Sequence, residues 1–386
     1  MRRIYLDHAA TTPLEPRVFE AMLPFLKEHY GNPSSVHSIG RKARHAIEES
    51  RERIAAQLGA EPAEIVFTSG GTEADNLALK GILRHPTQHL VTSAVEHKAI
   101  LTQAAAWQRR GGELTLLQPT STGSIAPRQL EEAVSENTSL VSLMHVNNEL
   151  GSLSPIRDLS GICRVKGVVF HCDAVQAAGL FRIDVNELGI DLLSISGHKF
   201  YGPKGIGVLY VHGGVDLRPL VEGGGQEQKR RGGTENVAAI VGLAAALDIA
   251  MEEAADNRQH LASLRDRLYR QLSEALGDAF IVNTPIDQQA SAPHILNISF
   301  VPIEGQPLDG EMLLRHLDMN GIMVATGSAC TSGSPEPNHV LTAIGRERAA
   351  ATATLRFSLG KSNTEEEIDY VVDKLSDIVS RTQITK

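Results

Sequence analysis

The chain has 386 residues, of which 42% are hydrophobic and 22% are charged. This length is sufficient for two or three domains with large buried cores. The 46 acidic and 37 basic residues give a net charge of −9, which argues against a generally basic nucleic-acid surface. No apolar run approaches the length of a membrane span, and the N-terminus lacks the apolar core of a secretory signal.

The three cysteines, Cys163, Cys172 and Cys330, form neither a CxxC pair nor a zinc-ligand spacing. Such cysteine usage suits a reducing cytosol, so we expect a cytoplasmic protein. The sequence contains no HExxH motif and no Walker A motif. Metalloprotease chemistry and P-loop chemistry therefore have no support.

An amphipathic helix is predicted at residues 41–58, where apolar residues recur at helical intervals. Short apolar runs separated by helical or turn segments follow, and this alternation predicts an α/β domain with a largely parallel sheet. Several runs are apolar on both faces, as is typical of strands covered by helices. The expected strands lie at residues 64–68, 89–93, 113–118, 139–146, 167–172, 191–196 and 205–211.

Residues 235–276 are rich in alanine and contain no proline, which predicts a long connecting helix or a pair of helices. We place the domain boundary within this segment. A large α/β domain then spans residues 15–255, and a smaller α+β domain comprises residues 1–14 and 256–386. In the smaller domain we expect strands at residues 294–300 and 354–358 and helices at residues 309–320 and 365–380.

Lys199 directly follows the expected strand 191–196, after a turn at Gly197. Desolvation at a strand end lowers the pKa of a lysine and makes its amine a nucleophile toward a carbonyl. The simpler interpretation is a lysine whose stem packs at the sheet edge. Asp173 and Gln176, at the end of another strand, favour the interpretation of Lys199 as a nucleophile. A Schiff-base lysine together with a carboxylate for a pyridinium nitrogen is what pyridoxal phosphate requires.

A candidate phosphate site lies where a glycine turn leads from a strand into a helix that begins near Thr72. The free backbone N–H groups of Gly71 and Thr72, with the Thr72 hydroxyl, suit a phosphate dianion. Ser196 and His198 flank Lys199 and are placed to donate to the same phosphate. A capped helix after a tight turn is the structural alternative.

Three further polar residues are candidates for the same site. His97 follows a strand, where a flat imidazole can stack on a pyridine ring and move protons. Asn148, beside Asn147, offers an amide to the cofactor phenolate or to a substrate carboxylate, and Arg356 offers the planar fork that binds an α-carboxylate. The structural alternatives are a hydrogen-bonding histidine, an Asx turn with Gly151 and a strand-end ion pair of Arg356.

Cys330 lies among small, polar, turn-forming residues, which predicts an accessible thiol on a mobile loop. Cys163 belongs to an apolar helical pattern. Cys172 is expected to point away from Asp173, because side chains alternate along a strand. Both are expected to be structural, whereas Cys330 is a candidate nucleophile; a loop cysteine without function is the alternative.

Taken together, these motifs resemble those of the NifS/IscS-type cysteine desulfurases of group I, which are class-V aminotransferases of fold type I. The resemblance covers essentially the whole chain, and the long loop around Cys330 separates it from the SufS-like group. The motifs lie at residues 5–13, 31–35, 68–73, 147–149, 173–176, 197–199, 231–236, 327–332 and 356–360.

The resemblance implies a fold-type I, pyridoxal-phosphate-dependent transferase with a seven-stranded, mostly parallel sheet and a smaller C-terminal α+β domain. It also implies a homodimer in which each active site borrows a phosphate contact from Thr234 of the other chain. L-cysteine would displace Lys199 from the cofactor, and the freed Lys199 would move the α-proton. The Cys330 thiolate would then attack the substrate sulfur, which leaves a persulfide on Cys330 and releases L-alanine.

The resemblance further implies a sulfur-acceptor or iron-sulfur scaffold protein as partner, for cluster assembly or tRNA thiolation, with Cys330 as a candidate transient cluster ligand. Two other functions remain open from the residues. A cystine or selenocysteine lyase, or an aminotransferase, would use the same cofactor, and a lyase would release pyruvate and ammonia in place of alanine. A non-enzymatic sulfur-trafficking adaptor would hold no cofactor, but the filled catalytic positions disfavour it.

Overall fold

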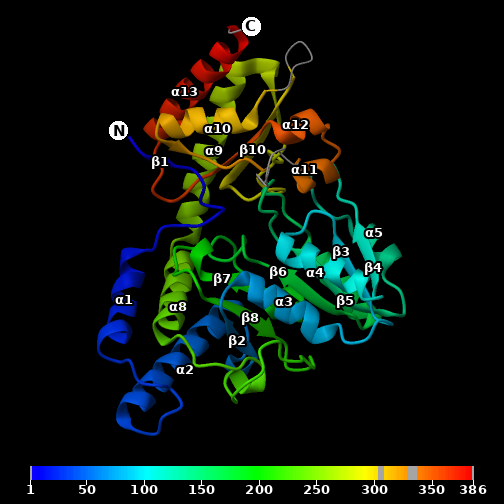
Figure 1. Ribbon diagram of the computed structural model, residues 1–386, viewed down its shortest axis with the longest axis vertical. Coiled ribbons are helices and arrows are strands. Elements are labelled where there is room, and N and C mark those ends of the chain that lie inside the picture. Colours follow the sequence, from blue (N-terminus) through cyan, green and yellow to red (C-terminus); the bar gives the residue numbers. More distant parts are fainter. Residues whose placement is uncertain (1, 303–307, 328–336, 385–386) are drawn as a thin grey trace.

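The computed structural model describes residues 2–302, 308–327 and 337–384, and it consists of a large and a small unit (Figure 1). Both termini lie at the small unit, and the chain enters the large unit through α1 and leaves it through α8 (Figure 1). Among the described helices, none is long and apolar enough to cross a membrane.

The large unit is built on a seven-stranded sheet in the order β2-β8-β7-β6-β5-β3-β4. All neighbours in it are parallel except β8, which pairs antiparallel with both β7 and β2. The predicted α/β fold with a seven-stranded, mostly parallel sheet is therefore confirmed. The strands are β2 (Ile65–Thr68), β3 (His89–Ser93), β4 (Glu113–Leu117), β5 (Thr138–Met144), β6 (Val169–Asp173), β7 (Leu192–Ser196) and β8 (Gly207–Val211).

Helices cover both faces of this sheet, and adjacent residues of one strand accordingly pack into different hydrophobic cores. Leu192 packs into a cluster with α3 and α4, whereas Leu193 packs into a cluster with α2, α6 and α8. Cys163 and Cys172 are both fully buried, as predicted. The helices of this unit are α1 (Pro16–Lys27), α2 (Ser38–Leu58), α3 (Gly71–Ile82), α4 (Lys98–Arg109), α5 (Pro127–Ala133), α6 (Ile156–Lys166), α7 (Val185–Leu188) and α8 (Val237–Glu252).

The small unit contains an antiparallel sheet in the order β12-β10-β9 and a two-stranded parallel pair, β1 with β11. Its strands are β1 (Ile4–Tyr5), β9 (Phe280–Val282), β10 (Ile295–Phe300), β11 (Ile322–Met323) and β12 (Thr354–Ser358). Its helices are α9 (Ala254–Leu276), α10 (Gly310–Met319), α11 (His339–Ala343), α12 (Arg348–Thr352) and α13 (Glu365–Ile384).

A separate hydrophobic core fills the small unit, and Ile4 and Leu6 from the N-terminus belong to it. The segment predicted as a long helix or helix pair forms two helices, α8 and α9, that meet at Glu253. We propose that the two units are the domains expected at residues 15–255 and at residues 1–14 with 256–386.

Gly207 lies where β8 packs closely against the turn that precedes α3. A Cβ on Gly207 would lie 2.7 Å from the carbonyl carbon of Gly70 and 2.7 Å from the carbonyl oxygen of Ile195. Backbone atoms cannot move aside as the end of a flexible side chain can. We therefore expect Gly207→Ala to lower the free energy of unfolding by about 1–3 kcal/mol in chemical denaturation.

Gly161→Ala is the matched control, because a Cβ on Gly161, inside α6, meets no atom within 4 Å. Alanine at such a helical position is expected to raise the free energy of unfolding by about 0.5–1 kcal/mol. Equal effects of the two substitutions would show that the close approach at Gly207 is relaxed in solution.

Candidate active site

A cavity of about 680 Å³ lies at the carboxyl ends of the parallel strands, with its far wall supplied by the small unit. In open parallel sheets this edge is the usual ligand site. The structure brings most of the predicted site residues together here. Those that line the cavity are Gly71, Thr72, His97, Asn148, Asp173, Gln176, Ser196, His198, Lys199 and Arg356.

Lys199 lies in a short 3₁₀ turn, Gly197–Lys199, directly after β7. Its Nζ donates hydrogen bonds to the carbonyl oxygens of Ala9, at 2.6 Å, and Ala10, at 2.8 Å. Burial, and next the positive charge of Arg356, lower the pKa of Lys199 to about 8. At pH 7 about one amine in ten is then unprotonated, which suits a nucleophile.

Asp173 ends β6 and is buried beside the cavity, where its Oδ1 accepts a hydrogen bond of 2.9 Å from the backbone of Val175. Burial raises its pKa, while the nearby His97 and Lys199 act in the opposite direction. Gln176, three residues on, donates from Nε2 to the carbonyl oxygen of Ala9 at 2.8 Å. The N-terminal segment is thus bound by both Lys199 and Gln176.

Two buried carboxylates beside Asp173 were not predicted from the sequence. Asp75, in α3, lines the cavity, and its Oδ1 has no hydrogen-bond partner among the described residues; it lies 3.7 Å from Nε2 of His171. Glu96 accepts hydrogen bonds from Ser93 Oγ, at 2.6 Å, and from a backbone N–H, and burial raises its pKa to about 8. Their proximity to Thr72 and His97 in the sequence was the only signal for them.

His97 forms the N-cap of α4, and its Nδ1 accepts a hydrogen bond of 3.1 Å from the backbone of Ala99. Burial lowers the pKa of the imidazole. A neutral ring whose Nδ1 accepts carries its proton on Nε2. His97 therefore combines a structural role, which the sequence left open, with a position in the cavity wall.

The two asparagines after β5 have different roles: one forms the Asx turn and the other lines the cavity. Asn147 makes the Asx turn, because its Oδ1 accepts from the backbone N–H groups of Glu149 and Leu150, each at 2.9 Å. Asn148 lines the cavity; its Nδ2 donates to Glu149 Oε1 at 3.1 Å, and its buried Oδ1 has no partner within the described ranges. Asn148 is thus the one available to a ligand.

Arg356 reaches the cavity from β12 of the small unit. Its Nη1 donates to Glu149 Oε1 at 2.7 Å, and its Nη2 donates to Asp7 Oδ1 at 3.0 Å. The ion pair that was the alternative interpretation therefore exists, and it involves two carboxylates. The buried Nε has no hydrogen-bond partner among the described residues, so its N–H is available to a ligand.

The N-terminus of α3 carries no side-chain cap, because Gly70 occupies the N-cap position. Gly70 has φ 149° and ψ −179°, a conformation that favours glycine. The first-turn N–H groups of Gly71 and Thr72 therefore face the cavity without a capping oxygen. His198 is held nearby by a 3.1 Å contact of its Nδ1 with Thr11 Oγ1, and burial lowers its pKa to about 4.

The cavity as a whole fits pyridoxal phosphate. An uncapped helix terminus suits the phosphate, a buried carboxylate suits a ring nitrogen, and an amine of lowered pKa suits the aldehyde. The orphaned Oδ1 of Asn148 and Nε of Arg356 supply polar groups that remain to be satisfied. These features come from five segments of the chain that only the fold brings together.

Two predicted site residues remain to be accounted for. Thr234 is exposed on the loop before α8 and does not line it. Cys330, predicted as nucleophile and as candidate cluster ligand, lies outside the described residues. Within the described ranges, no group of three or more His, Cys, Asp or Glu side chains is arranged to hold a metal ion.

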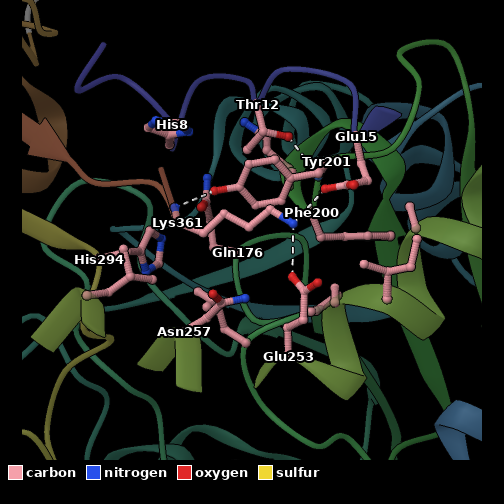
Figure 2. A pocket seen from close by; sticks show the side chains of 18 of the residues that line it. His8, Thr12, Glu15, Gln176, Phe200, Tyr201, Glu253, Asn257, His294 and Lys361 are labelled. Carbon is pink, nitrogen blue, oxygen red and sulfur yellow. Dashed lines mark hydrogen bonds and ion pairs between the residues drawn. The ribbon is translucent and has the colours of Figure 1, made fainter. Parts of the chain in front are cut away.

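A second, smaller cavity of about 40 Å³ is lined by Gln176, Tyr201 and Lys361 among others (Figure 2). Among the described residues, it shares Lys199 and Gln176 with the first. Beside it Lys361 donates to Glu15, at 2.6 Å, and to Glu253, at 2.9 Å, as the dashed lines in Figure 2 show. This ion cluster joins the N-terminal segment, the end of α8 and the small unit. It stabilises the wall against which Lys199 lies.

Comparisons with known proteins agree over nearly the full length. The family model of class-V aminotransferases matches residues 4–371. "Cysteine desulfurase IscS" of Dictyoglomus turgidum is 46% identical over 383 residues, which are 98% of this chain and 95% of that protein. "Putative cysteine desulfurase IscS 1" of Bacillus subtilis is 44% identical over 385 residues, covering 99% of this chain and 100% of that protein.

Among solved structures, one described as a NifS-like protein has a TM-score of 0.90 and 38% identity, over 98% of this chain and 100% of that chain. Another, described as SspA in complex with cysteine, has a TM-score of 0.81 and 38% identity, over 92% of this chain and 98% of that chain.

The lowered pKa of Lys199 can be measured in the cofactor-free protein. The rate at which an amine-specific reagent modifies the Lys199 peptide should be half-maximal near pH 8 and not near the ordinary value of 10.5. The rate should rise with pH, because only the unprotonated amine reacts. Peptide mass spectrometry gives the rate, with the other lysine peptides as internal reference. A midpoint near 10.5 would show that the amine is hydrated in solution.

Proposed function

The chain belongs to the class-V aminotransferase family, and on this premise we propose how its residues act as a cysteine desulfurase with pyridoxal 5′-phosphate as cofactor. Such an enzyme takes sulfur from L-cysteine and releases L-alanine. The observation that carries the proposal is the convergence of Lys199, Asp173, Arg356 and the uncapped N-terminus of α3 on one cavity.

The cofactor would be held at three places. The first-turn N–H groups of α3, the Thr72 hydroxyl, Ser196 and His198 bind its phosphate. Asp173 would pair with the ring nitrogen, and His97 would stack on the ring. When bound, pyridoxal phosphate supplies an electron sink for the charge left at the substrate α-carbon. Gln176 and Asn148, which also line the cavity, would contact the cofactor phenolate.

The protein's own groups then position L-cysteine and move its protons. Arg356 and Asn148 bind the α-carboxylate. Lys199, whose pKa is lowered to about 8, takes the α-proton as a general base, and the Nε2 proton of His97 is available to the substrate. A hydrogen bond from the Nε–H of Arg356 to the substrate carboxylate would satisfy this buried donor, which has no partner among the described residues.

The sulfur leaves through Cys330. Its thiolate bonds to the substrate sulfur, the bond between that sulfur and the β-carbon breaks with its electron pair going to carbon, and the β-carbon takes up a proton to become a methyl group. Lys199 returns a proton to the α-carbon, which gives L-alanine. Cys330 is left as a persulfide. Transfer of this sulfur to an acceptor protein, for iron-sulfur cluster assembly or tRNA thiolation, completes the function, with Cys330 as a transient cluster ligand in the first case.

The assembly we propose is a homodimer in a cytoplasmic location. The exposure of Thr234 supports it, because this threonine is available to the phosphate of a partner's cofactor and not to that of its own chain. The unpaired thiols of Cys163 and Cys172 support a reducing compartment.

A single turnover with L-cysteine and no reductant tests the reaction. We expect one added sulfur on the Cys330 peptide and one equivalent of alanine, measured by peptide mass spectrometry and amino-acid analysis. The peptides of Cys163 and Cys172 serve as buried controls and should stay unmodified. Cys330→Ser should form no persulfide. Pyruvate together with an unmodified Cys330 would make the enzyme a lyase.

The role of Arg356 is tested by Arg356→Lys, which keeps the charge but loses the planar fork. We expect the KM for L-cysteine to rise about tenfold to a hundredfold, because a hydrogen-bonded charge contact is lost, with a smaller change in kcat. Arg346→Lys is the control, since Arg346 binds Asn283 in the small unit and does not line the cavity. An unchanged KM in Arg356→Lys would mean that Arg356 serves only its ion pairs with Asp7 and Glu149.

A further inference from the structure

The loop of residues 221–236, which joins the large sheet to α8, contains an unusual backbone. Three successive residues that are not glycine, Glu227, Gln228 and Lys229, have φ angles of 45°, 56° and 66°. Side chains disfavour this left-handed region, and such conformations persist only where the surroundings enforce them. The loop is therefore held by contacts strong enough to maintain three adjacent strained residues.

The first of these three residues, Glu227, forms a buried ion pair with Arg51 of α2. Oε1 and Oε2 of Glu227 each accept a hydrogen bond of 2.9 Å from the guanidinium, and Oε2 also accepts one of 2.9 Å from the backbone N–H of Phe67 in β2. The two residues are only 5% and 4% exposed. A buried pair of this kind adds little net stability, but it fixes position.

Thr234 lies beyond this anchor and is held from both sides. Before it, Arg231 binds both carboxylate oxygens of Glu73, at 2.9 and 3.3 Å. After it, Glu235 accepts from Arg44 at 2.8 Å. Thr234 itself is exposed, and its hydroxyl makes no hydrogen bond within the part of the chain that the structure describes. A threonine held so firmly and left without a partner is presented to something outside its own chain.

We propose that the Arg51–Glu227 pair is the anchor that holds loop 221–236 in its strained form and thereby positions Thr234 for the cofactor phosphate of the partner subunit. This inference rests on the proposed function. Arg51 and Glu227 are positioning residues, since neither lines the cavity. The competing role is local, because the bond to Phe67 supports the strand that leads to Gly71 and Thr72 of the same chain.

Heterodimers in which one chain carries Lys199→Ala distinguish the two roles, and differently tagged chains allow their purification. In the first, Glu227→Gln is on the chain that keeps Lys199, so the one complete site borrows Thr234 from an intact loop. In the second, Glu227→Gln is on the Lys199→Ala chain, so Thr234 comes from the altered loop. The measurement is the affinity of the Lys199-containing site in a titration with pyridoxal phosphate, followed by the visible absorption of cofactor bound to Lys199.

We expect the second heterodimer to bind about tenfold more weakly than the first, which should match a heterodimer without the Glu227 substitution, since one contact to a charged phosphate is displaced. Thr234→Ala in the same two arrangements is the reference. If Glu227→Gln weakens cofactor binding only at the site of its own chain, or at neither site, this inference is overturned. If Thr234→Ala still weakens binding at the site of the other chain, the proposed contact across the dimer stands. No effect of Thr234→Ala across the dimer overturns this inference together with the proposed contact of Thr234 with the partner's cofactor, whereas the desulfurase reaction is tested separately by the single turnover with L-cysteine.

Arg51→Lys repeats the comparison in a form that keeps the buried charge paired, because removal of one partner from a buried pair can prevent folding. Lysine cannot donate to both carboxylate oxygens of Glu227 as the guanidinium does. Arg51→Lys should therefore also weaken cofactor binding when it is on the Lys199→Ala chain and not when it is on the chain that keeps Lys199. Asp369→Asn is the control. Its pair with Arg267 also has two hydrogen bonds, from Nε and Nη2 at 2.8 Å each, but it joins α9 to α13 within the small unit and should leave cofactor affinity unchanged.

Discussion

The site depends on one geometric constraint: parallel strands end at the same edge of the sheet. His97, Asn148, Asp173 and Lys199 follow four different strands, yet they line one cavity because those strands share a direction. Each strand end also leaves side chains partly shielded from water. Desolvation is accordingly the first cause of the shifted pKa of His97, Asp173 and Lys199. The same packing that builds the fold thus supplies the reactive amine.

The sheet edge alone does not complete the site. Arg356 comes from the small unit, and the two carbonyl groups that bind Lys199 come from residues 9 and 10. Arg356 joins these segments directly, since it binds Asp7 near the N-terminus and Glu149 after β5. Charges that would be costly alone are arranged as a network that spans both units. The relative position of the two units is therefore part of the chemistry.

Much of this arrangement was predictable, because it follows from local patterns. The predicted strands at 89–93 and 354–358 coincide with β3 and β12. The turn from β2 into α3 could be recognised from the adjacent Gly70 and Gly71, but the absence of a side-chain cap at this helix terminus is a finding of the structure. The short strands β1 and β11 were not predicted, because two residues carry no periodicity and Ile4 is a strand residue only through its pairing with Ile322. Asp75 and Glu96 were missed for a similar reason, since only the tertiary fold buries them.

The pairing of β1 with β11 has a consequence for biosynthesis. Residues 4 and 5 leave the ribosome first, but their partners, residues 322 and 323, emerge after more than three hundred further residues. Until then residues 4 and 5 have no strand to join, and Asp7 lacks its ion-pair partner Arg356. The parallel pair of β1 with β11 and the ion pair of Asp7 with Arg356 therefore form only near the end of translation, when the C-terminal part of the small unit has been made.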